Sequence, residues 1–201
     1  MDAFDAILNI LDKKGAEQDA LPFASLHQAG VQPFPTANIA TDLEPIVKVH
    51  SGSKAFIVGY DGANLSAPDY PWVRILKEWL DAGCDVTYLL LNPSPKSLEA
   101  LAPLSITKTS GRLCVYGIDK SKAGSPRTLE MINQWRAFHF AIFEDPRQLW
   151  VECDHQPGDT KARDCYFFPE DVAKKPGLPD ILKSKFEYVV RTCGMNLITQ
   201  N

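Results

Sequence analysis

The sequence of 201 residues has no C-x-x-C pair among its five cysteines. The cysteines are odd in number and widely spread, so neither a structural zinc site nor a disulfide framework is expected. We expect the cysteines to be reduced thiols that are mostly buried. No apolar run reaches the roughly 18 residues that a membrane-spanning helix needs. The acidic start also lacks the basic residues of a signal peptide. Together these absences predict a cytoplasmic protein with no membrane partner.

An excess of positive charge is also missing, because the net charge is −4. Non-specific binding to nucleic acid needs a basic surface, so this partner is not favoured. The chain has no internal repeats and no low-complexity segments. With 45% hydrophobic and 23% charged residues, its composition is that of an ordinary globular protein with a core of its own.

The first 53 residues differ in pattern from the rest. Apolar residues at helical spacing predict an amphipathic helix over 3–13, ended by Gly15. Several prolines then predict an irregular arm with two short strands, at 37–40 and 45–49. The helix either packs on its own core or forms the contact of a homodimer. We therefore expect a helix and arm over 1–53 and a folded domain over 54–201.

From residue 54 onward, strand-like and helix-like segments alternate. Strands are predicted at 55–60, 85–91, 113–117, 138–144, 148–154 and 165–168. Helices are predicted between Pro71 and Gly83, at 97–101, at 125–135, and from Pro179 onward. This order predicts a single α/β domain with a mixed, largely parallel sheet flanked by helices, whose C-terminal part contains an antiparallel hairpin.

Polar residues follow the first three predicted strands, where ligands bind in open α/β sheets. They are Asp61, Asn64 and Ser66 after the first strand, Asn92 and Ser94 after the second, and Lys120 and Lys122 after the third. Their hydroxyl, amide and ammonium groups suit a phosphate or another small anion. Each position also lies in a loop that must turn, so ordinary turn residues are the alternative interpretation.

The predicted hairpin carries an unusual number of titratable groups. Its two histidines and four carboxylates are His139, Glu144, Asp145, Glu152, Asp154 and His155. In a strand over 148–154, Glu152 and Asp154 point to one face with Trp150 beside them, which suits an oxygen-rich site for Mg²⁺ or Mn²⁺. A solvated sheet face is the alternative for the carboxylates, and a hydrogen-bonded core histidine is the alternative for His139.

The run Val58-Gly59-Tyr60-Asp61-Gly62-Ala63-Asn64-Leu65 resembles the first strand of NYN/PIN-type ribonucleases. In that family an aspartate at the end of the strand binds a divalent metal, and Asn-Leu follows. The resemblance covers about eight residues and implies that Asp61 is a metal ligand.

A second resemblance extends over residues 54–168 and is to phospholipase-D-like phosphodiesterases. Residues 72–90 are similar to that family's helix, glycine turn and strand, and His139 opens the strand that feeds the hairpin. The resemblance implies that His139 attacks phosphorus and that a lysine holds the phosphate oxygens.

The family's motif is His, any residue, Lys, four residues, then Asp. Aligned on His139, the lysine position is Ala141 and the aspartate position is Pro146, with Asp145 one residue early. Only one such motif is visible, whereas the chemistry needs two histidines, from two halves or from a dimer. Ordinary phospholipase-D catalysis is therefore not expected.

The direction of the strand over 138–144 decides whether these residues lie near the polar loops. A helix joins it to the strand over 113–117, which favours a parallel crossover. His139 would then lie at the end of the sheet opposite Asp61 and the other strand-end loops.

Three functions remain open. The first is a cytoplasmic binding or assembly module on a divergent phospholipase-D-like fold. The second is a metal-dependent phosphodiesterase or nuclease, with His139, His155 and Asp61 catalytic and Asp61, Glu152 and Asp154 holding Mg²⁺ or Mn²⁺. The third is a sensor of a small anion or nucleotide that uses the strand-end loops.

Overall fold

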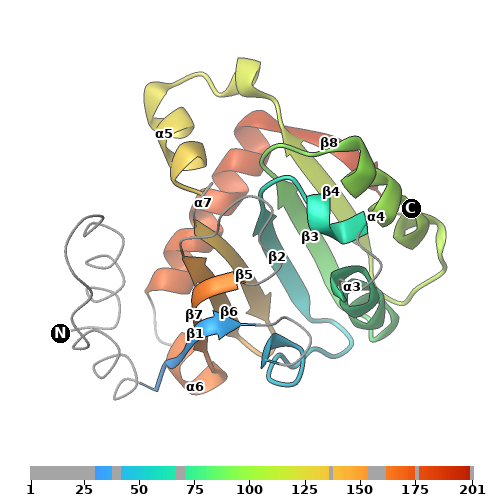
Figure 1. The fold of residues 1–201 in the computed structure, drawn as a ribbon, viewed down its shortest axis with the longest axis vertical. Helices are drawn as coiled ribbons and strands as arrows, with labels where there is room; N and C mark the ends of the chain where they lie inside the picture. The colour runs from blue at the N-terminus through green and yellow to red at the C-terminus, as the bar shows by residue number, and fades with distance from the viewer. Residues whose placement is uncertain are drawn as a thin grey trace.

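One eight-stranded sheet forms the centre of the protein (Figure 1). The computed structural model describes residues 30–37, 42–66, 71–135, 138–153, 162–174 and 177–199. The strands are β1 (Gln32–Ala37), β2 (Lys54–Gly59), β3 (Asp85–Leu90), β4 (Leu113–Ile118), β5 (Phe138–Glu144), β6 (Gln148–Cys153), β7 (Ala162–Phe168) and β8 (Gly194–Thr199). Their order across the sheet is β1-β7-β6-β5-β2-β3-β4-β8.

Helices cover both faces of this sheet. The α-helices are α3 (Trp72–Asp81), α4 (Pro95–Ile106), α5 (Pro126–Gln134), α6 (Glu170–Ala173) and α7 (Leu178–Cys193), and the short 3-10 helices are η2 (Ala63–Ser66) and η3 (Lys120–Lys122). One core contains the buried residues of α3 and α4, and the other contains those of α5, α6 and α7. Figure 1 shows α3 and α4 in front of the sheet and α7 behind it.

The prediction of a largely parallel sheet is wrong. Of the seven strand pairings in the described residues, only β2–β3 and β3–β4 are parallel, and the other five are antiparallel. The error has a physical cause. The antiparallel strands β5, β6 and β7 contribute buried side chains to the cores on both faces of the sheet, so they have the continuous hydrophobicity that is usual for parallel strands.

The prediction of a parallel crossover into β5 is also wrong. After β4 and α5 the chain crosses to the far side of β2, and β5 pairs with β2 in the antiparallel direction, with Val58 opposite Phe140. The place beside β4 is taken by β8, which follows α7 directly. A helix between two strands therefore determined neither the neighbour nor the direction of the second strand.

The N-terminal arm contributes to the same sheet. β1 pairs with β7, and Leu43 and Val47 belong to the core on the α3 side. The strand expected at 45–49 does not form, and β1 ends where the one expected at 37–40 was to begin. The helix predicted over 3–13 lies outside the described residues.

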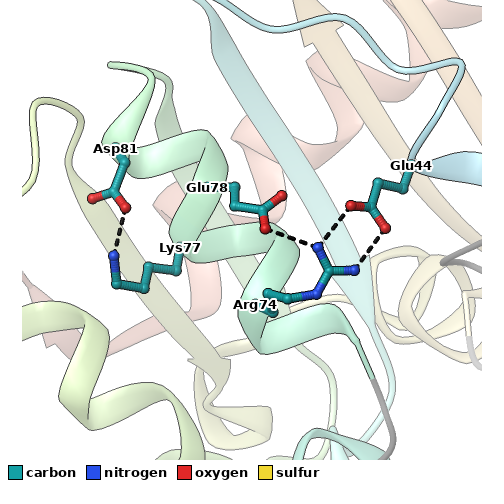
Figure 2. Close-up of polar contacts among 5 residues, drawn as sticks. All are labelled: Glu44, Arg74, Lys77, Glu78 and Asp81. Carbon is teal, nitrogen blue, oxygen red and sulfur yellow. Dashed lines mark hydrogen bonds and ion pairs between the residues drawn. The ribbon is translucent and has the colours of Figure 1, made fainter.

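Ion pairs attach this arm to α3. Figure 2 shows the guanidinium of Arg74 between two carboxylates, with both of its terminal nitrogens 2.7 Å from the two oxygens of Glu44. It also donates to Glu78, one turn further along the helix, at 2.8 Å. The hydrogen bond from Arg74 holds the pKa of Glu44 below its usual value.

Local signals in the sequence explain where the helices begin. Ser94 and Ser125 accept hydrogen bonds from backbone N–H groups in the first turns of α4 and α5, and each is followed by a proline. The helix predicted from Pro179 onward is α7, and its Leu182, Phe186 and Val189 are all buried. No helix in the described part of the chain is long and apolar enough to cross a bilayer.

Candidate functional site

The direction of β5 brings the hairpin to the same edge of the sheet as the loop after β2. Because β5 runs antiparallel to β2 with Phe140 opposite Val58, His139 lies at the carboxyl end of β2. Asp61 follows that end of β2 by two residues. The expectation that His139 lies at the opposite end of the sheet from Asp61 is therefore wrong.

His139 and Glu152 are opposite each other on β5 and β6. Nδ1 of His139 lies 3.8 Å from Oε2 of Glu152, and the two side chains are only 7% and 13% exposed. The indole N–H of Trp150, two residues before Glu152 on the same strand face, donates to Oε1 of Glu152 at 2.8 Å. The carboxylate is thus held between an imidazole and an indole.

Tyr88 on β3 joins this group from the other side of β2. Burial raises the pKa of its hydroxyl, a hydrogen bond with Trp72 opposes that rise, and the charges of Glu152 and Asp61 add to it. Both carboxylates are therefore close enough to act on the same phenol. We call Asp61, Tyr88, His139, Trp150 and Glu152 the edge cluster.

A glycine in the central strand makes room for the phenol. A Cβ atom at Gly59 would lie 2.7 Å from the hydroxyl oxygen of Tyr88, closer than real Cβ contacts come. Gly59 is also the last residue of β2, two residues before Asp61. The absence of a side chain there lets the hydroxyl of Tyr88 cross towards the hairpin.

The cluster faces the helices α3 and α4. Tyr88 and Trp150 belong to the core on that side, and so does Ala141, which shares the face of His139 two residues away. The cluster combines two carboxylates, one imidazole and one phenol, mostly out of water. Such groups can exchange hydrogen bonds or bind a ligand that offers donors.

The other residues of the phospholipase-D-like motif are not assembled around His139. Ala141, at the lysine position, is 2% exposed and lies between Ile57 and Trp150 in the sheet. Asp145 lies in the turn after β5, with a side chain that is 79% exposed. It lies six positions after His139 along an extended strand, a distance of about 20 Å.

The metal site predicted from Asp61, Glu152 and Asp154 is only partly in view. Asp154 and His155 lie outside the described residues. Within them, no three His, Cys, Asp or Glu side chains are grouped closely enough to hold a metal ion. Asp61 and Glu152 share Tyr88 as a neighbour.

The residues predicted to bind an anion have separate places along this edge. Ser94 caps α4 by accepting a hydrogen bond from the backbone N–H of Ser97 at 3.1 Å. Lys122 forms an ion pair with Asp119 at 3.4 Å. Asn92 and Ser66 are exposed at the surface.

The sheet also separates these residues. Asn64 and Ser66 lie in η2, which contacts α4 on one face. Lys120 and Lys122 lie in η3, which contacts α7 on the other face. The described structure does not bring these residues together around one anion. The hydroxyl of Ser94 instead caps the first turn of α4.

One member of the edge cluster, Tyr88, and its hydrogen-bond partner Trp72 were missed by reasoning from sequence. Tyr88 lies inside an apolar strand and Trp72 at the start of an amphipathic helix, so both have the pattern of ordinary core residues. Only the arrangement of β3 beside β2 brings Tyr88 towards the hairpin residues. No signal in the sequence indicates it.

No family model matches the sequence, and neither does any curated protein.

Proposed function

We propose that this chain is a binding or assembly module related in pattern to phospholipase-D-like proteins and without their ordinary catalysis. The observation that carries the proposal is the environment of Ala141. A lysine that holds phosphate oxygens must reach solvent and substrate. The position that it would occupy is 2% exposed and is packed between strands, so this chain has no group there to stabilise a phosphoryl transition state.

The environment of His139 supports the same proposal. A histidine nucleophile must present a ring nitrogen to phosphorus. Here the residue is 6% exposed, its Nε2 atom is buried, and its Nδ1 atom faces Glu152. The pair connects β5 to β6 inside the fold, and this is a structural role.

One observation favours a second candidate function, a metal-dependent phosphodiesterase. Asp61 follows the carboxyl end of β2, His139 lies at that same end, and Glu152 is opposite His139, so two carboxylates lie at one edge of the sheet, and carboxylates are the usual ligands of Mg²⁺. Asp154 would have to complete such a site.

A hydrolysis assay separates the two functions. The full chain is incubated with bis(p-nitrophenyl) phosphate and with single-stranded RNA, in EDTA and then in Mg²⁺ or Mn²⁺. His139→Asn and Asp61→Ala test the two candidate centres. Glu99→Ala, a change at an exposed carboxylate of α4, is the matched control.

We expect all four proteins to leave both substrates at the background rate under every condition. Hydrolysis in EDTA that disappears in His139→Asn would overturn the proposal in favour of phospholipase-D-like catalysis. Hydrolysis that needs the metal and disappears in Asp61→Ala, but not in Glu99→Ala, would establish the second candidate.

A further inference from the structure

We draw no further inference here: the strongest candidate, the apolar surface patch with Ile181 and Tyr188 on the exposed face of α7, is an unpartnered helix face, and nothing in the described part of the chain shows what covers it.

Discussion

The parallel strands β2, β3 and β4 and the antiparallel strands β5, β6 and β7 use polar residues in different ways. After the parallel strand β3, the side chain of Ser94 accepts a hydrogen bond from the backbone and caps α4. In the antiparallel strands they are buried within the strands. His139 and Gln148 are 6% and 4% exposed, and Gln148 accepts a hydrogen bond from the backbone of Lys48 at 3.0 Å.

This difference shows where the chemistry of the protein resides. Buried polar groups are costly unless they have partners, so their position is strongly constrained by the fold. The parallel strands shape the edge and place Asp61 and Tyr88, and the antiparallel strands supply the imidazole and the second carboxylate. The edge cluster exists because the two sets of strands meet along β2 and β5.

The largest expected effect comes from a substitution in the core that the parallel and the antiparallel strands share. Phe143 on β5 is fully buried, and its ring packs edge-on against Trp79 of α3, with centroids 5.1 Å apart. Phe143→Ala should lower the free energy of unfolding by about 3–5 kcal/mol, because it leaves a cavity. Urea denaturation measures the loss. Ile106→Ala, at an exposed site, is the control, and a similar loss in both variants would contradict the prediction.

A smaller effect is expected in the loop after the parallel strand β2, at the residue that follows Asp61. Gly62 has φ +66°, and a Cβ there would lie 2.7 Å from Cβ of Ser97. Gly62→Ala should cost about 2–4 kcal/mol, from backbone strain and overlap together.

Gly52 offers a matched control for this change. It also has a positive φ, of +91°, but a Cβ there meets nothing within 4 Å. Gly52→Ala should therefore show the cost of the backbone alone, about 1 kcal/mol or somewhat more. Thermal unfolding of both variants checks the order, and equal losses would show that the overlap at Gly62 is relieved.

A third prediction concerns the buried polar groups of the antiparallel strands. Glu152→Leu removes the acceptor of the Trp150 indole N–H and should cost about 1–3 kcal/mol, since that donor is left buried. Glu152→Gln retains a carbonyl oxygen for the indole and should cost less than about 1 kcal/mol. Urea titration followed by tryptophan fluorescence compares them. A larger loss in the glutamine variant would show that the charge beside His139 matters more than the hydrogen bond.

The smallest effect is expected where the turn of the hairpin contacts α7. Arg147 donates to the carboxylate of Asp180, and this bond holds the pKa of Asp180 below its usual value. A carboxyl whose folded pKa is lowered stabilises the protein above its unfolded pKa, and the stabilisation is lost as the pH falls through the folded value. Because both groups are partly exposed, solvent screening limits the effect to less than about 1 kcal/mol.

Asp180→Asn should therefore be less stable than the native chain at neutral pH and equally stable at about pH 2. The amide oxygen can still accept the backbone N–H of Gly177, so the variant isolates the charge. Asp171→Asn, at an exposed site of α6, is the control. A difference between Asp180→Asn and the native chain that persists in acid would show that the loss is one of packing.

Much of the local structure follows from the sequence because apolar spacing reports burial directly. The predicted strands over 55–60, 85–91 and 138–144 match β2, β3 and β5 closely. Proline and glycine punctuation located α3 and α7 to within a few residues. β8 was not predicted, because a half-exposed strand directly after a helix has no alternating pattern of its own.

The candidate site was predicted in its parts but not in its assembly. His139, Glu152 and Asp61 were selected by residue type and by their position at strand ends. Their proximity depends on the direction of β5, which the sequence indicated wrongly. The contribution of Tyr88 depends in turn on Gly59, whose small size matters only because β3 lies beside β2.

The sequence by itself determined most of the elements from residue 54 onward and the absence of the motif lysine, since these depend on the residues and their near neighbours. Only the tertiary structure decided the neighbours and direction of β5, and with them the edge cluster and the place of β8 beside β4. The physical reason is that a strand buried on both faces has the same hydrophobic pattern in either direction. The pairing of β5 with β2 in the folded sheet fixes its orientation.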